Sequence, residues 1–123
     1  MEYIVRKRSK LLGLPLSFTK YTINDSRITV TRGFLNIEED YVLMYKVQDI
    51  YLKRSYLERL FGLGSIICNT GDKSLPILKL TRIRKSRQIK RYLLTASEEA
   101  RKIRREASRK KRELEHPEEY EEF

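Results

Sequence analysis

The stretch LSFTKYTINDSRITVTRGFL, residues 16–35, holds two runs of β-branched and aromatic residues around the turn-forming pair Asn24-Asp25. In the second run, Ile28 and Val30 alternate with polar residues, which is the pattern of a strand with one buried and one solvated face. We therefore expect a β-hairpin with strands at residues 16–23 and 26–35.

The β pattern continues from this hairpin to residue 80. In DYVLMYKV, a period of two places four large side chains on one face of a strand: Tyr41, Leu43, Tyr45 and Val47. The following DIYLKRS turns Ile50 and Leu52 inward. Two further runs, SIICNT and LPILKL, flank the turn signal GDKS and predict a second hairpin. Six or seven short strands joined by turns indicate an antiparallel sheet or a partial barrel.

The periodicity after the last strand is that of a helix. Ser86 is suited to cap it, and Ile89, Tyr92 and Leu93 share an apolar face that would cover the open end of the barrel. The stretch TASE, residues 95–98, has the spacing of a capping box. It either begins a second helix or lies within one long helix, and the pattern leaves both arrangements open.

The chain after residue 95 is charged and has little apolar surface. Its apolar residues form a narrow seam at heptad-like spacing: Ala96, Ala100, Ile103, Ala107 and Leu114. Because alanine buries little area, we expect residues 95–116 to leave the globular part of the molecule. Pro117 ends the helix, and the acidic residues 117–123 are expected to be disordered.

The length and composition fit a single domain. With 123 residues, 40% of them hydrophobic and 36% charged, the chain has material for one core and a solvated part. Cys68 is its one cysteine, which excludes an internal disulfide and favours a reducing, cytoplasmic location. No apolar run reaches the length of a membrane span.

Positive charge is concentrated late in the sequence. The net charge is +10, and residues 79–112 carry fifteen Lys/Arg against three acids, whereas residues 113–123 carry six acids alone. Such a segment attracts anionic membranes or nucleic acid. One candidate group surrounds the last strand and the helix start: Lys79, Arg82, Arg84, Lys85, Arg87, Lys90 and Arg91. A second group forms a helix arm: Arg101, Lys102, Arg104, Arg105, Arg109, Lys110, Lys111 and Arg112. If the termini meet, four N-terminal residues join the first group: Arg6, Lys7, Arg8 and Lys10.

Residues typical of catalytic sites are scarce. His116 is the one histidine, so neither a histidine-based triad nor a two-histidine metal site is available. Cys68 alternates with Ile66 along a strand and is interpreted as a buried structural thiol. The acidic run from Glu38 to Asp40 is interpreted as a solvated strand connection. We therefore expect a protein that is not an enzyme and that uses no metal or cofactor.

The stretch RLFGLG, residues 59–64, places two glycines among apolar residues. A dinucleotide fingerprint needs a third glycine at position 67, where isoleucine stands, and a helix rather than a strand after the loop. We expect a structural role instead, in which a short amphipathic turn plugs the barrel and the glycines reverse the chain. The apolar residues of this turn are Tyr56, Leu57, Leu60 and Phe61, and the glycines are Gly62 and Gly64.

The opening stretch, the later stretch VLMYKVQDIYLKRSYLERLFGLGSIICNTGD and the final helix together resemble the bacterial pleckstrin-homology-like (PH-like) domains of the YdbS/YdbT-like type. The resemblance covers about residues 14–94. Its matching residues in the first stretch are Thr22, Arg27, Val30 and Gly33. Those in the second are Leu43, Val47, Asp49, Ile50, Arg54, Ser55, Arg59, Leu60, Gly62 and Gly64.

This resemblance implies a mainly β fold with a C-terminal helix: a barrel of about seven antiparallel strands in two nearly orthogonal sheets, capped by one helix and followed by a charged helical extension. The chain then divides into four parts. These are a basic N-terminal segment at 1–13, a PH-like domain at 14–94, the helical extension at 95–116 and an acidic tail at 117–123.

The resemblance also implies a non-enzymatic binding module in the cytoplasm or at the membrane periphery. We expect its basic face to recognise a protein partner or an anionic membrane surface. The alternatives are nucleic-acid binding or self-assembly through the C-terminal helix. Phosphoinositide-binding PH domains carry basic residues in the first hairpin loop, where this chain has Asn24, Asp25 and Ser26, so specific phosphoinositide recognition is not expected.

Overall fold

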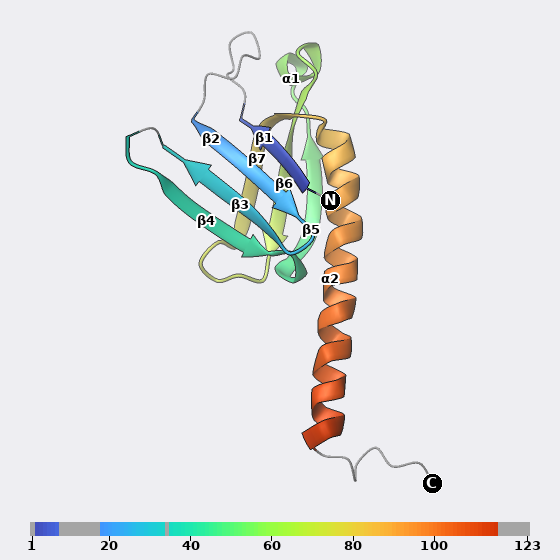
Figure 1. Ribbon diagram of the computed structural model, residues 1–123. Helices are drawn as coiled ribbons and strands as arrows, with labels where there is room; N and C mark the ends of the chain where they lie inside the picture. The colour runs from blue at the N-terminus through green and yellow to red at the C-terminus, as the bar shows by residue number, and fades with distance from the viewer. Residues whose placement is uncertain (1, 8–17, 34, 116–123) are drawn as a thin grey trace.

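Two antiparallel sheets and one long helix make up the computed structural model, which describes residues 2–7, 18–33 and 35–115 (Figure 1). The first sheet has the order β1 (Glu2–Arg6), β2 (Thr19–Asn24), β3 (Arg27–Arg32), β4 (Glu38–Leu43). The second has the order β5 (Val47–Lys53), β6 (Leu63–Thr70), β7 (Ile77–Arg84). The 3-10 turn η1 (Met44–Lys46) joins the sheets, α1 (Tyr56–Leu60) joins β5 to β6, and α2 (Ser86–Glu115) follows β7. The expected class, mainly β with a C-terminal helix, is confirmed.

The hairpin predicted from residues 16–35 is β2 and β3. Its turn is closed by Asn24, whose side-chain oxygen accepts hydrogen bonds from the backbone N–H groups of Ser26 (2.9 Å) and Arg27 (3.0 Å). An asparagine side chain that imitates a backbone carbonyl in this way is typical of tight turns. It sets the register in which Tyr21 faces Val30, and both side chains are buried.

The strand β1 is absent from the sequence prediction, which places residues 1–13 in a basic segment ahead of the domain. Residues 2–6 instead pair with β2, with Tyr3 opposite Ile23. Tyr3 and Val5 pack against the core while Glu2 and Arg6 are exposed. This period of two is present in the sequence, but over five residues with two charged ends it is too short to identify a strand.

Residues 40–47, expected to form one strand, do not. β4 ends at Leu43, η1 carries the chain from the first sheet to the second, and β5 begins at Val47. Val42, Met44 and Val47 are the buried side chains, so the expected apolar face of Tyr41, Leu43 and Tyr45 is wrong. Val42 and Met44 keep the period of two, and the 3-10 turn then places buried Val47 three positions after Met44, because it advances the chain by a helical rather than an extended step.

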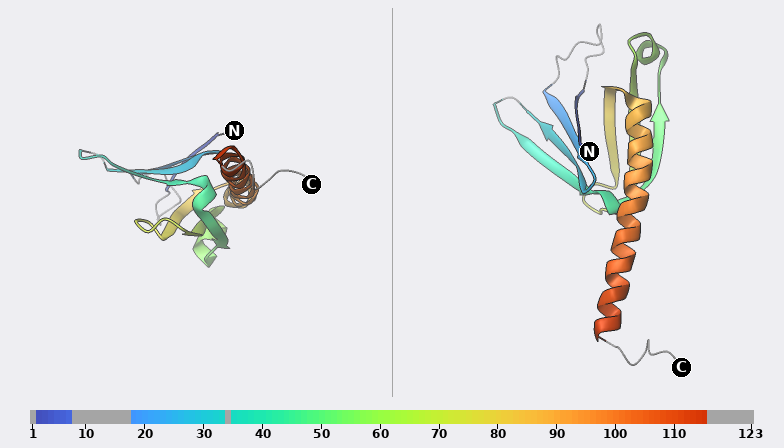
Figure 2. Two further views of the ribbon diagram at one scale, coloured as in Figure 1. Left: turned by 90° about the horizontal axis from the view of Figure 1, so that it is seen from below. Right: turned by 45° about the vertical axis from the view of Figure 1, so that its right-hand side comes forward.

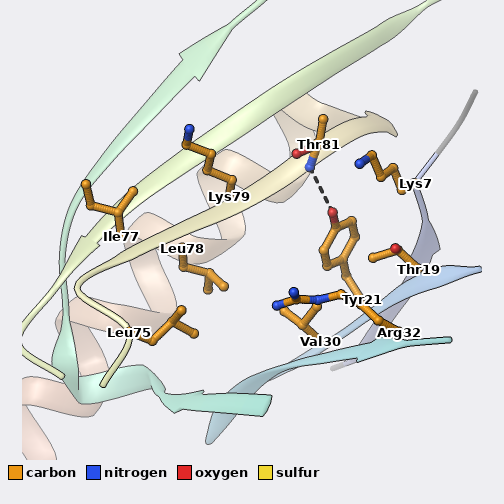
Figure 3. A pocket seen from close by; sticks show the side chains of 10 residues that line it. All are labelled: Lys7, Thr19, Tyr21, Val30, Arg32, Leu75, Ile77, Leu78, Lys79 and Thr81. Atoms are coloured by element: carbon orange, nitrogen blue, oxygen red, sulfur yellow. Dashed lines mark hydrogen bonds between the residues drawn. The ribbon is translucent and has the colours of Figure 1, made fainter. Parts of the chain in front are cut away.

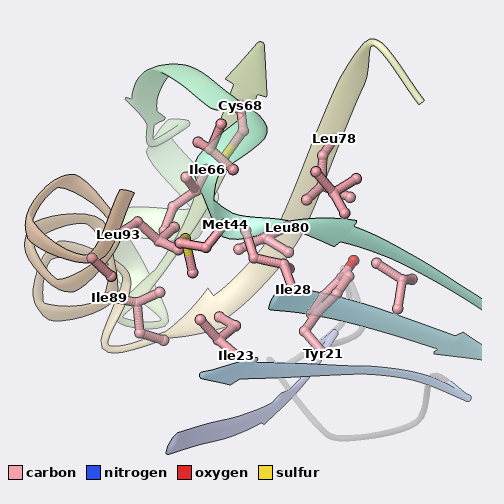
Figure 4. Packing of buried hydrophobic residues seen from close by; sticks show 14 of the residues in the cluster. Tyr21, Ile23, Ile28, Met44, Ile66, Cys68, Leu78, Leu80, Ile89 and Leu93 are labelled. Carbon is pink, nitrogen blue, oxygen red and sulfur yellow. The ribbon is translucent and has the colours of Figure 1, made fainter. Parts of the chain in front are cut away.

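The C-terminal helix is a single element of 30 residues, so the arrangement with one long helix is the one that forms. Its first three turns bury Ile89, Leu93 and Ala96 against both sheets (Figure 4). From Lys102 onward its side chains are exposed, except for half-buried Glu113. Figures 1 and 2 show this last part projecting beyond the sheets. The expected acidic tail, residues 117–123, lies outside the described residues.

One continuous core joins the two sheets and α2. Its buried members from the first sheet and η1 are Tyr21, Ile23, Ile28, Val30, Val42 and Met44. Those from the second sheet are Val47, Ile66, Cys68, Leu78, Leu80 and Ile83, and those from α2 are Ile89, Leu93 and Ala96. Side chains from all three layers meet at the centre in Figure 4. Burial of each large apolar residue stabilises the fold by about 1.5–3 kcal/mol.

The two glycines of RLFGLG have different roles. Gly62 has a left-handed backbone (φ 69°) and reverses the chain after α1, as expected. Gly64 has no positive φ and lies buried within β6, so its expected role in the reversal is wrong. A Cβ placed on Gly64 would lie 2.8 Å from the Cβ of Ser86 and 3.2 Å from Cγ of Arg54. Gly64 is therefore required for the close approach of α2's first residue to the sheet.

We expect Gly64→Ala to lower the free energy of unfolding by about 1–3 kcal/mol, because overpacking forces α2 away from β6. Urea denaturation monitored by circular dichroism measures this change. Ser86→Gly in the same chain should restore most of the loss.

Gly71→Ala is the matched control. The nearest atom to a Cβ there is the amide nitrogen of Gln48, 3.1 Å away at the end of a flexible side chain. This variant should be close to neutral. A double variant as unstable as the sum of its single substitutions would show that Gly64 and Ser86 are not coupled.

Candidate functional site

One end of the molecule gathers basic residues around the junction of β7 and α2. Arg84, the last residue of β7, is paired with Leu63 at the start of β6. Lys85 has a left-handed backbone (φ 58°), which turns the chain sharply from strand into helix. Arg84, Lys85 and Arg87 are exposed here. Both Figure 1 and the right view of Figure 2 place α1 and the start of α2 at this same end.

The β5–β6 hairpin adds basic residues that the sequence analysis did not select. Residues 53–65 and 82–91 together carry nine Lys/Arg and one acid, Glu58. We call these nine residues the basic end: Lys53, Arg54, Arg59, Arg82, Arg84, Lys85, Arg87, Lys90 and Arg91. The pairing of β6 with β7 brings the two segments together. That pairing joins positions about twenty residues apart, which spacing along the sequence does not reveal.

A bulge in β7 keeps Arg82, one residue of the basic end, from facing the core. Gly64 faces Ile83 and Ile66 faces Leu80, so β7 has one extra residue between these pairs. Arg82 lies in the bulge with φ 48°, and its backbone N–H donates to Oγ of Ser65 at 3.0 Å. Without the bulge, the alternation after Leu80 would turn Arg82 inward. The extra residue instead buries Ile83 and keeps the arginine outside the core.

The N-terminal strand also borders the basic end. Arg6 lines a groove of about 600 Å³ with Arg84, Lys85 and Gln88. The side-chain amide of Gln88 donates to the hydroxyl of Tyr3 at 3.0 Å, which ties β1 to the start of α2. Arg6 therefore lies beside the candidate residues.

Lys79 lies on a different surface. It lines a pocket of about 270 Å³ between the two sheets, together with Lys7 and Arg32 (Figure 3). Arg32 is 3.6 Å from the carboxylate of Asp40. At the centre of Figure 3, the hydroxyl of Tyr21 accepts a hydrogen bond of 3.1 Å from the backbone N–H of Thr81. Lys79 is thus separated from the other six residues of its predicted group.

Two further N-terminal cations, Arg8 and Lys10, lie outside the described residues.

The short helix α1 does not plug the barrel, contrary to the expectation from its apolar residues. Three of the four lie largely in solvent, with Tyr56 75% exposed, Leu57 57% and Leu60 61%, and Phe61 is partly exposed at 38%. Leu63, at the start of β6, is the buried apolar residue next to this turn. The apolar residues of α1 therefore lie on the surface at the basic end.

The predicted helix arm divides into two parts. Arg101 donates a hydrogen bond to the backbone carbonyl of Val47, and the guanidinium of Arg104 lies over the ring of Tyr45, 4.9 Å from its centre. These two residues attach α2 to η1 and β5. The remaining six are exposed: Lys102, Arg105, Arg109, Lys110, Lys111 and Arg112. Arg109 is 3.8 Å from Glu113 one turn later. Only these six residues of the predicted arm form a surface clear of the domain.

The family of the chain follows from comparison with known proteins. The family model described as Bacterial PH domain matches residues 12–111. The chain belongs to the bacterial PH domain family. No curated protein and no solved structure matches it. The two-sheet fold with its C-terminal helix agrees with this family, and assignment to the YdbS/YdbT-like type stays a prediction. PH-like domains are generally non-catalytic binding modules.

The described part of this PH domain contains no cluster of three or more His, Cys, Asp or Glu side chains placed to hold a metal ion. Among the same residues, no helix combines the length and apolarity needed to cross a membrane. Cys68 is fully buried in β6, as expected for a structural thiol. Burial raises the pKa of the Cys68 thiol to about 12, which keeps it protonated at neutral pH.

We expect Cys68 of the native PH domain to resist thiol reagents such as Ellman's reagent at pH 8, because only the thiolate is nucleophilic. In denaturant one thiol per chain should react within minutes. Rapid labelling of the native protein, at a rate independent of added denaturant, would contradict a buried and protonated Cys68.

Proposed function

We propose that this PH domain binds an anionic membrane surface through its basic end. The observation that carries the proposal is the coincidence, at one end of the molecule, of exposed cationic side chains with exposed apolar ones. Arg84, Lys85 and Arg87 are exposed at the end of the molecule that also carries α1, where apolar side chains are in solvent. A membrane interface offers anionic headgroups and an apolar interior to the same surface, so it fits both features.

The strength of such binding follows from the charges. Each Lys or Arg close to an anionic leaflet contributes about 1 kcal/mol, and the attraction falls off within a Debye length of about 8 Å at physiological salt. Several of the nine residues must therefore reach the surface together to give useful affinity. The cytoplasmic leaflet carries the anionic lipids, which supports a location at the inner membrane surface.

We expect replacement of Arg84, Lys85 and Arg87 by glutamine to weaken binding to vesicles containing phosphatidylglycerol by roughly 100-fold, since about 3 kcal/mol of attraction is removed. Vesicle co-sedimentation at several salt concentrations measures this change. Binding of the unchanged chain should weaken steeply with salt and should be much weaker on pure phosphatidylcholine.

The matched control removes the same charge at the other end of α2, by replacing Arg109, Lys110 and Lys111 with glutamine. This variant should keep nearly all of its vesicle binding. Equal losses in both variants would indicate attraction by net charge alone. Absence of binding by the unchanged chain would overturn the proposal and leave protein recognition as the function of the basic end.

The projecting part of α2 supports nucleic-acid binding as a second candidate function. Seven exposed Lys/Arg lie along residues 102–112, six of them besides Arg104, which packs over Tyr45, and the one acid among them is Glu106. A single exposed helix is of a size that the DNA major groove admits. Self-assembly is less well supported, because Ala96 and Ala100 pack on the domain. The exposed seam is reduced to Ile103, Ala107 and Leu114, which spans less than two heptads.

For this second function we expect the two triple variants to exchange roles. The variant at Arg109, Lys110 and Lys111 should lose binding to duplex DNA or RNA, whereas the variant at Arg84, Lys85 and Arg87 should keep it. Fluorescence anisotropy with a labelled duplex measures both affinities. The slope of log K against log salt should be shallower for the arm variant, because fewer of its cations neutralise phosphates. Equal binding by the unchanged chain and the arm variant would exclude the arm as a nucleic-acid site.

A further inference from the structure

The helix α1 is an amphipathic helix whose apolar face is turned outward. Positions 56, 57, 60 and 61 fall on one side of a helix with 3.6 residues per turn, and the residues there are Tyr, Leu, Leu and Phe. Glu58 and Arg59 occupy the other side. In a helix packed on a domain the apolar face normally lies against the core. Here the side toward the domain is the one that carries Glu58.

Polar contacts fix α1 in this orientation. The hydroxyl of Ser65 in β6 donates to the carboxylate of Glu58 at 3.0 Å. Ser55 caps the helix by accepting the backbone N–H of Glu58 at 3.2 Å. Beside them, Nε of Arg54 donates to the carbonyl of Leu63 at 2.9 Å, which holds the two ends of the hairpin together. The apolar face is therefore presented to solvent by specific contacts.

The surroundings of α1 indicate what covers this face. Figure 1 shows α1 protruding at this end, and three of its apolar side chains are more than half exposed while Phe61 is partly exposed. Clustered exposed apolar residues of this kind mark interaction sites. Nine Lys/Arg and one acid lie in the two segments that make up this end. The acid, Glu58, is already hydrogen-bonded within the domain. An apolar tip within a cationic rim is complementary to a bilayer with anionic headgroups, which needs no preformed groove to receive it.

We propose that α1 is a membrane-insertion element: Tyr56, Leu57, Leu60 and Phe61 enter the boundary between headgroups and acyl chains while the basic end contacts the headgroups. This inference rests on the proposed membrane function. It adds that the β5–β6 hairpin is the part that enters the membrane, and so sets how deeply the domain binds and which way it faces. The cationic residues supply attraction that salt screens. The apolar residues of α1 supply attraction that salt leaves in place.

Tryptophan fluorescence tests the insertion directly, because the chain contains no tryptophan. Leu57→Trp in the full chain should shift its emission to shorter wavelength on vesicles containing phosphatidylglycerol. Lipids brominated along the acyl chain should quench it. The matched control is Leu114→Trp, at a position that is also exposed but lies next to the last residue of α2. Its emission should stay unchanged on the same vesicles. Emission of Leu57→Trp that stays unchanged while co-sedimentation shows the protein bound would overturn the insertion and leave the electrostatic function intact.

A second measurement separates the apolar from the cationic contribution. Leu57→Ser with Leu60→Ser should weaken vesicle binding on the order of tenfold per side chain, and the loss should persist in about 1 M salt, where the Debye length is about 3 Å. Ile103→Ser, at an equally exposed position on the projecting part of α2, should have no effect. Thermal unfolding should change little, since the two leucines lie outside the core. Undiminished binding by the double variant would contradict insertion by α1, and failure of the unchanged chain to bind any vesicle would remove both proposals.

Discussion

Packing of the first half of α2 is the constraint on which the rest of the molecule depends. The two sheets share no strand pairing among the described residues. The chain passes from one to the other at η1, and the hydroxyl of Tyr21 in β2 accepts a hydrogen bond from Thr81 in β7. Ile89 and Leu93 fill the space where the sheets meet, each stabilising the fold by about 1.5–3 kcal/mol. Polar contacts hold the helix on both sides: Tyr92 donates to Asp25 in the β2–β3 turn, and Arg101 donates to Val47 at the start of β5. Burial, with the neighbouring Asp25 carboxylate, raises the pKa of Tyr92 and keeps it a donor. Displacement of α2 would therefore remove core contacts from both sheets at once.

The elements predictable from sequence are those whose side chains repeat regularly, and prediction fails where the chain leaves its period. The β2–β3 hairpin was predictable because Ile28 and Val30 alternate cleanly and Asn24 supplies the turn chemistry. The path from β4 to β5 was not, since the 3-10 turn places the buried side chains of Met44 and Val47 three positions apart and so breaks the period of two. The bulge at Arg82 was unpredictable for a similar reason. Its backbone N–H is satisfied by Ser65, seventeen positions away, and single-sequence patterns do not report such distant partners.

For the candidate site, the sequence reveals which charged residues are present but not where the fold places them. The positive charge of residues 79–112 can be read directly from the sequence, because charge is a property of composition. Two facts about its placement were not predictable. Lys79 lines a pocket between the sheets, away from Arg84, and the β5–β6 hairpin meets Arg84 through the pairing with Leu63. Both depend on how the strands pair. The four apolar residues of α1 were predicted to lie inside the barrel, and the structure places them on the surface. Their spacing correctly indicated a helical face, but spacing cannot tell whether a face meets the core or the solvent. The bond from Ser65 to Glu58 decides that here.

The direction of α2 separates the two groups of cations. The helix starts at the basic end and its 30 residues extend for about 45 Å, so Arg109 to Arg112 lie about 35 Å along it. That separation is several times the Debye length of about 8 Å at physiological salt. With the basic end on a membrane, the charges of the arm add almost nothing to the attraction, whatever the net charge of the chain. Because the same helix forms part of the core, its direction is fixed relative to both sheets. A molecule bound to the arm would consequently be held at a set distance from the surface that the basic end contacts.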